Sequence, residues 1–380
     1  MPTRGTPAVL VLSVEMRDFR TYGRAEAALG SGLTVVHGSN GAGKSNLLEA
    51  IYYGSTGRSP RTRNERELIR FGAEATRVTV RLMDGEDRHE LTVAFGAGGA
   101  GRGPVKRMSS DGADVERLLD VETRPLVSVF MPDRLELVKG APAVRRAHLD
   151  QLLAALWPAR AGARAAYSRV LAQRNALLGR IRAGRASTAT LDAWDRELAE
   201  AALVVMANRA AAVELIAAEF ASRAERLGAV AGVTIEYRPR SRAADRDGLV
   251  AELQERLASD VERGYTGHGP HRDELAITAQ GRELRVYGSQ GEQRLALLAL
   301  LLAERAVLGR ERGRTPLMLL DDVMSELDGE RRRLLVDDLA ADGQSVIATT
   351  DLAHVPGAGE PSVARLRISP GTVLREALAA

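Results

Sequence analysis

The chain lacks cysteine altogether and is poor in aromatic residues. With no cysteine among 380 residues, a disulfide framework and thiolate metal sites are excluded, which fits a reducing compartment. Aromatics make up 4%, so the core must be built mainly from Leu, Val and Ala. No run of about 18 uncharged apolar residues is present, and the apolar start is too short for a secretory signal. We therefore expect a cytoplasmic protein without a membrane partner.

Lysine is almost as scarce as cysteine. Of the 53 basic residues only three are lysine, namely Lys44, Lys106 and Lys139. The net charge is only +3, and nearly all of the positive charge is guanidinium, which favours bidentate phosphate contacts. Nucleic acid is therefore permitted as a partner but not required, since codon composition would explain the arginine content equally well.

The first 120 residues alternate short apolar runs with turn signals, a pattern typical of strands. Residues 96–114 are Gly-rich and predict a flexible hairpin tip. A helix is expected over 45–53, directly after the second strand. The expected strands are 8–14, 32–37, 77–82 and 89–95.

The middle of the chain changes to Ala, Leu, Arg and Glu with helical periodicity. Gly184 marks a turn between two long helices, which predicts an antiparallel helical pair projecting from the strand-rich lobe. The strand and helix alternation then returns, so the first lobe is interrupted by an insert. We expect three segments, 1–125, 126–263 and 264–380. In the last, strands are expected over 274–279, 282–288, 316–322 and 345–350, and helices over 290–308 and 329–341.

The stretch "GSNGAGKS" fits the phosphate-loop pattern G-x-x-x-x-G-K-[ST] between a strand and a helix. Glycines let successive backbone N–H groups point at phosphate oxygens, and the helix N-terminus adds partial positive charge. The competing interpretation is a mere tight turn. The pattern predicts ATP binding, with Lys44 on the β- and γ-phosphates and Ser45 on Mg²⁺. The loop residues are Gly38, Ser39, Asn40, Gly41, Ala42, Gly43, Lys44 and Ser45.

A second motif, "TPLMLLDDVMSELD", is an apolar run that ends in two carboxylates. In a parallel sheet these acids would lie at the carboxyl edge, beside the phosphate loop. Asp321 would then contact Mg²⁺, and Asp322 would orient or deprotonate the attacking water. With Lys44 they form the predicted catalytic set. Alone this motif is weak, and its value comes from co-occurring with the loop.

The third motif is "YGSQGEQR", directly before a long apolar helix. Ser289 and Glu292 have the S-x-x-E spacing of a capping box, which by itself indicates only a well-capped core helix. Gly288 and Gly291 beside a bare helix N-terminus also make an anion site.

Taken together, these motifs resemble the ABC-type ATPases, in the form typical of the SMC, Rad50 and RecF branch. The resemblance implies an α/β ATPase head with a mixed sheet, an inserted helical arm and no long coiled coil. It also implies a D-loop containing Ser325 and Asp328. In such proteins the signature completes the ATP site of a second subunit. The implied signature residues are Ser289, Gln290, Gly291, Glu292 and Gln293.

The resemblance narrows to the RecF family of bacterial recombination mediators, on five segments in the family's order. It implies an ATP-dependent homodimer that grips duplex DNA near single-strand junctions, with RecR and RecO as partners. The alternatives are a transporter's nucleotide-binding subunit and a structural SMC-like head. The five segments are 38–62, 132–150, 265–275, 287–294 and 318–328.

Three departures from the superfamily pattern are evident. Asp322 stands where a Glu base is usual, so slow hydrolysis is expected. The switch His is missing, leaving Thr349 or Thr350 as candidates, because His354 comes slightly too late. No Gln suits the Q-loop, and "FMPD" at 130–133 takes its place.

Weaker candidates have two interpretations each. In "GHGPHRDE", residues 267–274, a metal cluster competes with a structured turn near the nucleotide or between lobes. Arg17 and Arg20 resemble a basic nucleotide contact of the SMC-like branch, against solvated residues. Arg102, Lys106 and Arg107 on the Gly-rich tip would touch a DNA backbone, against an exposed hairpin. Arg145, Arg146 and the arginines of the long helices are expected to be solvated.

Overall fold

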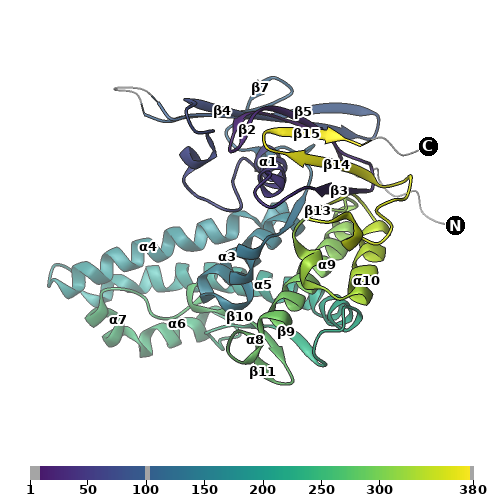
Figure 1. Ribbon diagram of the computed structural model, residues 1–380. Coiled ribbons are helices and arrows are strands. Elements are labelled where there is room, and N and C mark those ends of the chain that lie inside the picture. The colour runs from purple at the N-terminus through teal and green to yellow at the C-terminus, as the bar shows by residue number, and fades with distance from the viewer. Residues whose placement is uncertain (1–8, 99–102, 377–380) are drawn as a thin grey trace. The chain divides into compact units, whose positions relative to one another are not determined.

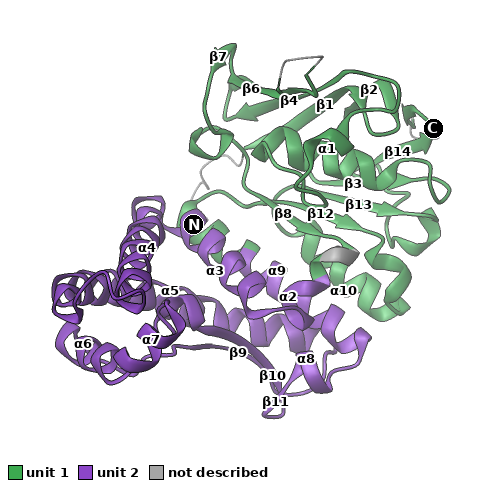
Figure 2. Ribbon diagram, turned by 90° about the vertical axis from the view of Figure 1, so that its left-hand side faces the viewer, with its two compact units in different colours: residues 1–134, 305–380 green, residues 135–304 purple. Residues whose placement is uncertain are grey.

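The computed structural model describes residues 9–98 and 103–376. Its internal contacts divide it into two compact units, shown in green and purple in Figure 2. Unit 1 comprises Met1–Arg134 and Arg305–Ala380, and unit 2 comprises Leu135–Glu304. The divisions fall later in the chain than the boundaries expected at 126 and 264. The signature segment therefore belongs to unit 2 and not to the unit that carries the phosphate loop.

Unit 1 contains a largely parallel sheet in the order β15-β14-β3-β13-β12-β8. Strands β14, β3, β13, β12 and β8 run parallel, and β15 is antiparallel at one edge. The central strands are continuous apolar runs because both faces of the sheet are covered. The strands are β3 (Leu33–His37), β8 (Val127–Phe130), β12 (Leu317–Asp321), β13 (Ser345–Thr349), β14 (Ala364–Ser369) and β15 (Thr372–Arg375).

A second, antiparallel sheet has the order β2-β1-β4-β5-β6-β7. The hairpin predicted at the Gly-rich stretch 96–114 is confirmed, because β5 and β6 pair antiparallel, but residues 105–110 form strand β6 and not part of a flexible connection. The short strand β2, poor in β-branched residues, was also not predicted. The strands are β1 (Leu10–Phe19), β2 (Tyr22–Ala28), β4 (Ala75–Asp84), β5 (Asp87–Gly96), β6 (Val105–Ser110) and β7 (Ala113–Asp114).

Helix α1 (Lys44–Thr56) lies between the two sheets of unit 1, as Figure 1 shows. Its Leu47, Leu48 and Ile51 are fully buried in the core shared with both sheets. Gly54 permits this close packing, because a Cβ there would lie 2.4 Å from Cγ2 of Val80. Helix α10 (Gly329–Ala340) belongs to the same unit and confirms the helix predicted there. The core of unit 1 thus fixes the start of α1, where the phosphate loop ends.

Unit 2 is mainly helical. The long helices α4 and α5 pack against each other and are joined through Gly184, whose φ of 68° suits glycine, as predicted. Helix α9 begins at Gln290 as expected. The helices are α2 (Glu136–Lys139), α3 (Pro142–Leu156), α4 (Gly162–Arg182), α5 (Asp192–Arg226), α6 (Arg246–Glu255), α7 (Leu257–Arg263), α8 (Leu284–Tyr287) and the larger part of α9 (Gln290–Arg312), whose residues from Arg305 on belong to unit 1.

A small antiparallel sheet, β11-β10-β9, also belongs to unit 2. Strand β10 (Glu274–Ala279) was predicted, but β9 (Val233–Arg238) falls in the region assigned to helices alone. The strand predicted over 282–288 is also wrong. Only β11 (Arg282–Glu283) pairs there, and the chain then turns into α8. Single 3-10 turns complete the chain: Glu65–Leu68, Leu118–Asp120, Pro132–Leu135, Pro158–Arg160, Thr188–Leu191, Pro270–Arg272, Val323–Glu326 and Leu352–His354.

Several arginines of unit 2 are buried, which corrects the expectation of solvated helix faces. Arg174 is 0% exposed and donates to Asp195, Asp260 and Thr266. Its neighbours therefore hold it as part of the core. Other arginines with the same kind of buried, paired environment are Arg145 and Arg209.

The segment Thr188–Arg226 is long and apolar enough to cross a membrane by length and composition alone. Its apolar side chains have another explanation. Leu198, Val205 and Val213 are buried, and the helix α5 packs against α4, α6, α3 and β9. The core of unit 2 buries 39% of the most apolar window of this segment and so accounts for part of its hydropathy.

Candidate nucleotide site

The phosphate loop connects β3 to α1 and depends on glycine at two points. Gly43 has φ 118°, and a Cβ there would lie 2.8 Å from the Tyr22 hydroxyl, which donates to the Gly43 carbonyl at 2.9 Å. A Cβ on Gly38 would lie 2.4 Å from the Ile368 carbonyl oxygen. Side chains are excluded at both positions, so the backbone alone forms the curl. Ser39, Asn40 and Gly41 between them are exposed.

Lys44 is the first residue of α1 and lies inside the curl of the loop. It is 8% exposed, and its ammonium donates to the carbonyls of Gly38 at 2.8 Å and Ser39 at 3.0 Å. Burial lowers the pKa of Lys44, and the nearby Asp322 and Asp321 carboxylates oppose that shift. A positive charge held at a helix N-terminus among backbone N–H groups is a site for phosphate.

Asp321 ends β12, two strands away from β3 across β13. Because these strands are parallel, their carboxyl ends meet at the same edge as the loop. Burial raises the pKa of Asp321, and a hydrogen bond from the Ser45 hydroxyl counteracts this. Lys44, Ser45, Asp321 and Asp322, which the sequence separates by more than 270 positions, are therefore neighbours.

Asp322 has φ 51°, a left-handed conformation that is uncommon for a non-glycine residue. Its backbone N–H donates to the Ala348 carbonyl at 3.1 Å. Its Oδ1 is buried without a hydrogen-bond partner in the described part of the chain. Buried carboxylate oxygens rarely lack partners, so this atom is poised for a cation or a water. The oxygens of Ser45, Asp321 and Asp322 are the hard donors that Mg²⁺ prefers.

The signature segment in unit 2 forms the predicted capping box. The Ser289 N–H donates to Glu292 Oε2 at 2.7 Å, and the Glu292 N–H donates to Ser289 Oγ at 3.3 Å. Ser289, Gln290 and Gly291 are exposed, whereas Gln293 is 7% exposed. The Gln293 amide donates to the Leu284 carbonyl at 2.9 Å, so this side chain stabilises the turn between α8 and α9. The exposed residues alone are available to an external ligand.

Comparison with known proteins settles the family. The family model "RecF/RecN/SMC N terminal domain" matches residues 10–361. The DNA replication and repair protein RecF of Myxococcus xanthus is 38% identical, covering 96% of both chains. That of Streptomyces avermitilis is also 38% identical, covering 96% of this chain and 99% of its own. The chain belongs to the RecF family.

Solved structures agree with the family assignment. The recombination mediator protein RecF of the RecFOR pathway, in a structure with ATPrS, matches with a TM-score of 0.83. It is 27% identical and covers 99% of this chain and all of that one. An Smc head bound to a domain of ScpA matches with a TM-score of 0.58 at 17% identity, which concerns the fold alone. The predicted ABC-type ATPase head without a long coiled coil is thus confirmed.

Sequence reasoning missed a buried carboxylate beside the RecF-family loop. Glu49, on α1, is 0% exposed and bound bidentately by Arg20 at 2.8 and 2.9 Å. It also accepts from Ser59 at 2.6 Å and from Arg61 at 3.2 Å, and Arg61 lowers the pKa of Asp321 by its charge. The signal was a Glu inside an apolar helix, five residues after Lys44. Because that helix is buried, the carboxylate of its Glu needs cationic partners.

The two N-terminal arginines differ in position. The Arg20 guanidinium is bound to Glu49 and the Glu67 carbonyl, so a nucleotide contact would require it to leave them. Arg17 is exposed on β1, on the sheet face opposite to the one that packs on α1. The nucleotide contact expected of Arg17 is therefore wrong, because the sheet lies between it and the loop.

The switch and D-loop candidates follow the carboxyl ends of their strands. Thr349 is buried, and its hydroxyl donates to the Asp351 carbonyl at 3.0 Å, whereas Thr350 is exposed. Ser325 Oγ donates to the Asp322 carbonyl at 2.8 Å, and Asp328 caps α10 by accepting from the Arg331 N–H. Their signalling roles stay predictions. So does the Q-loop role of "FMPD", which begins with Phe130, the last residue of β8, beside β12.

His354, which the RecF-family pattern places too late to serve as the switch, has a buried Nδ1. That atom has no hydrogen-bond partner in the structure as described.

The "GHGPHRDE" segment is a hydrogen-bonded turn of unit 2. His268 pairs with Glu252, and His271 contacts the Tyr167 hydroxyl at 2.6 Å and the Thr266 carbonyl at 2.9 Å. Burial lowers the pKa of His271 to about 4. Among the described residues no group of His, Asp or Glu has the arrangement of a metal site, which favours the structured turn.

The basic residues of the Gly-rich tip also differ from one another. The Lys106 ammonium is held by Glu65 and lies 5.4 Å from the Tyr53 ring centroid, so it is structural. Arg107 is exposed on β6. Arg102 lies outside the described residues.

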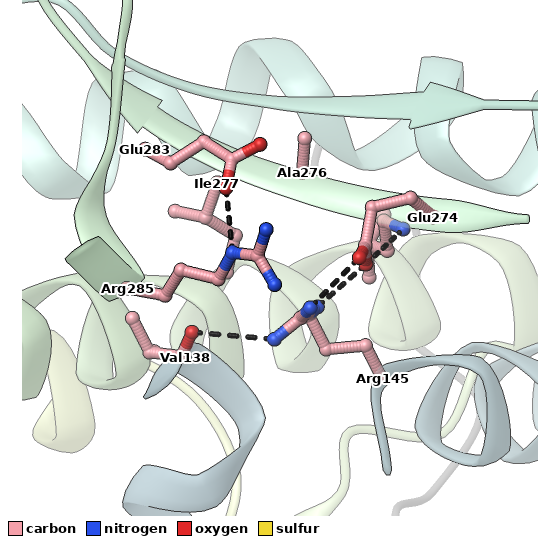
Figure 3. Close-up of a pocket in the computed structure, with 8 residues that line it drawn as sticks. Val138, Arg145, Glu274, Ala276, Ile277, Glu283 and Arg285 are labelled. Atoms are coloured by element: carbon pink, nitrogen blue, oxygen red, sulfur yellow. Dashed lines mark hydrogen bonds and ion pairs between the residues drawn. The ribbon is translucent and has the colours of Figure 1, made fainter. Parts of the chain in front are cut away.

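A small pocket in unit 2, drawn in Figure 3, holds two ion pairs. Arg145 binds Glu274 bidentately at 2.7 and 2.9 Å, and Arg285 pairs with Glu283 at 2.5 Å. Because the charged groups are matched inside the pocket, it presents no unsatisfied group to a ligand.

Proposed function

We propose that this RecF-family chain is a slow, switch-type ATPase that dimerises on ATP and grips duplex DNA. The observation that carries the proposal is the convergence of Lys44, Ser45, Asp321 and Asp322 at one sheet edge. No residue of the signature belongs to unit 1. We infer that the signature of a second copy supplies the remaining contacts to the γ-phosphate.

Each residue has a distinct role in the proposed reaction. The backbone N–H groups of the loop hold the phosphates, and the Lys44 ammonium leaves its two carbonyl partners to bind the β- and γ-phosphate oxygens. Mg²⁺, held by Ser45 and Asp321, neutralises phosphate charge when bound. Asp322 orients the attacking water through its free Oδ1 and accepts its proton. Aspartate is one methylene shorter than the usual Glu, so hydrolysis is slow.

In this proposal, dimerisation couples ATP binding to DNA binding. Ser289 and Gly291 of one copy contact the γ-phosphate in the other, because they are exposed at the N-terminus of the 23-residue helix α9. The D-loop residues Ser325 and Asp328 run beside the two sites. Hydrolysis removes the γ-phosphate bridge and lets the copies separate from DNA.

The cellular setting follows from the relatives. The similar solved structures are of the recombination mediator protein RecF in the RecFOR pathway. We extend this setting to the present chain, with RecR and RecO as partners and gapped DNA as the place of action. The chain would then work in the cytoplasm, beside the chromosome.

Lys44→Met tests the proposal. Losing a charged hydrogen bond of about 2.7 kcal/mol weakens ATP binding about 100-fold. Fluorescent ATP titration measures the affinity, and sedimentation velocity with ATP–Mg and duplex DNA measures the dimer. Lys139→Met is the matched control, because its side chain is 46% exposed and, among the described residues, has Glu136 as its one ion-pair partner. An ATP-dependent dimer that persists in Lys44→Met would refute the proposal.

A further inference from the structure

A row of arginines crosses the outer face of the antiparallel sheet of unit 1. Arg17 on β1 pairs directly with Arg24 on β2 and with Arg77 on β4. Arg77 pairs with Ala94 on β5, which pairs in turn with Arg107 on β6. Directly opposed residues of an antiparallel sheet point to the same face, so the four arginines form one line over five strands. We call Arg24, Arg17, Arg77 and Arg107 the arginine row.

The row faces solvent. All four arginines are exposed, whereas the neighbours that alternate with them, such as Met16, Val78 and Val93, are buried in the core with α1. Figure 1 shows this sheet with α1 on one side, and the row lies on the other side.

The charges of the row are not neutralised within the described structure. Arg24 approaches Glu15 at 3.6 Å, but the side chains of Arg17, Arg77 and Arg107 have no hydrogen bond or ion pair there. Like charges placed directly opposite each other destabilise a sheet. The row therefore has an unfavourable arrangement in the isolated chain, which an external polyanion would relieve.

Arg81 on the same sheet shows the contrasting arrangement. Its guanidinium binds Glu26 at 2.8 Å and Glu15 at 3.1 Å, and it lies 3.5 Å from Glu90. The acids next to the row are thus engaged by Arg81. On the opposite side the sheet carries Ala75 and Gly96, which leave room above it. A bound anion is repelled from the acidic side and admitted on the side of the small residues.

We propose that the arginine row binds the sugar–phosphate backbone of duplex DNA. This inference rests on the proposed function and names the surface that it uses. Four steps between strands of about 4.8 Å give a row of about 19 Å. One DNA strand advances about 3.4 Å per phosphate, so the row spans roughly five phosphates. Guanidinium groups bind phosphates bidentately, and from a flat sheet they read no base edges.

The floor of the row argues against a protein partner. It consists of Ala94, Ala75, Gly96 and the exposed Val105, and none of these four is one of the large aromatic anchors that dominate protein interfaces. A regularly spaced polyanion needs charge and a flat floor, and both are present.

The test replaces three arginines of the row by glutamine, in Arg17→Gln, Arg77→Gln and Arg107→Gln combined. Anisotropy of a labelled duplex is measured in ATP–Mg over a series of salt concentrations. Each phosphate contact contributes about 0.9 to the slope of log K against log salt, so the slope becomes shallower by about 2.7. Affinity at low salt falls about 100-fold or more, equally for different sequences. ATP binding is unchanged.

Arg88→Gln is the matched control. Arg88 is exposed on the same face of β5, six residues from Ala94, which is about 20 Å along the strand. It changes net charge in the same way as one substitution in the row, but leaves the salt slope unchanged. A thermal melt of the triple variant is expected at or above the wild-type midpoint, because opposed like charges are removed.

Two results would overturn the inference. If the wild-type chain binds duplex DNA with ATP–Mg and the triple variant keeps its affinity and slope, the row is not the DNA surface. If the triple variant melts early, the single Arg77→Gln variant decides, since it must still lower the slope by about 0.9. A wild-type chain that fails to bind DNA at all refutes the proposed function itself, which is a distinguishable result.

Discussion

Two charged groups, Arg209 in unit 2 and Asp322 in unit 1, differ in how fully the fold pairs their buried atoms. In unit 2, Arg209 donates to Asp150 through two nitrogens and to the Pro270 carbonyl through a third. In unit 1, Asp322 keeps a buried oxygen without any partner in the described structure, and burial raises the pKa of Asp321 beside it. Satisfied charges hold a core together. Unsatisfied ones at a strand end indicate a site that awaits its ligand.

This contrast helps to distinguish structural charges from functional ones in the chain. Arginine content permitted nucleic acid as a partner without requiring it, and the arginines of unit 2 with the deepest burial are structural. The charges at the proposed site differ from these in lying at the phosphate loop and at the carboxyl end of β12, where Asp322 Oδ1 has no partner in the described structure. The following predictions would break or sharpen that contrast.

Arg209→Met should have the largest effect on stability. Removing Arg209 takes the ion-pair partner from the buried Asp273 and leaves Asp150 paired with the exposed Arg164 alone among the described residues. The expected loss is about 3–5 kcal/mol of unfolding free energy, measured by urea denaturation. Arg169→Met, exposed on α4, is the control and should change stability by less than about 0.5 kcal/mol. Equal stabilities for both variants would show that the buried arginines of unit 2 are not structural.

Asp322→Asn should separate function from stability. Loss of a general base lowers the rate of ATP hydrolysis about 100- to 1000-fold, whereas ATP binding persists and the dimer on DNA is long-lived. Its Oδ1 makes no hydrogen bond, so stability should change by less than about 1 kcal/mol. A single-turnover assay and urea denaturation provide the two measurements. Asp337→Asn, exposed on α10, controls for the change of charge. Normal ATP turnover together with a large loss of stability would show that Asp322 is a structural residue and not the general base.

His271 gives unit 2 a pH dependence of known sign. Burial lowers its pKa from the ordinary 6.5 to about 4, opposed by its hydrogen bond to the Thr266 carbonyl. The unfolded chain therefore binds a proton at a higher pH than the folded chain. The stability from the neutral imidazole is complete above about pH 6.5 and is lost as pH falls towards 4. Between pH 7 and 5 the loss is about 2 kcal/mol.

His271→Gln should remove that part of the pH dependence while leaving the other titrations in place. Urea denaturation of both chains at pH 7 and pH 5 gives the comparison. If the two chains lose the same stability between these pH values, the imidazole is not held neutral in the fold.

Much of the fold was readable from the sequence because its signals are local. The strand before the loop, the helix after it and the capping box at Ser289 each depend on neighbouring residues. Strand β9 was missed because its partner β10 lies about 40 residues on, beyond any local pattern. The arginine row is invisible for the same reason, since its members come from four strands that only the register brings into line.

The smallest expected effect on stability concerns Ser289, which caps α9 in unit 2 and is proposed to contact a partner's γ-phosphate. Ser289→Asp keeps an equally good N-cap for α9, so unfolding free energy should change by less than about 0.5 kcal/mol. Its negative charge, however, repels a partner's γ-phosphate, and ATP-dependent dimerisation should be lost by sedimentation velocity. Ser289→Ala is the converse variant, because it loses the cap at a cost of about 1 kcal/mol but brings no repulsion. If Ser289→Asp still dimerises with ATP, Ser289 only caps α9 and does not contact a partner's nucleotide. Its role would then be structural, like that of the buried arginines of unit 2.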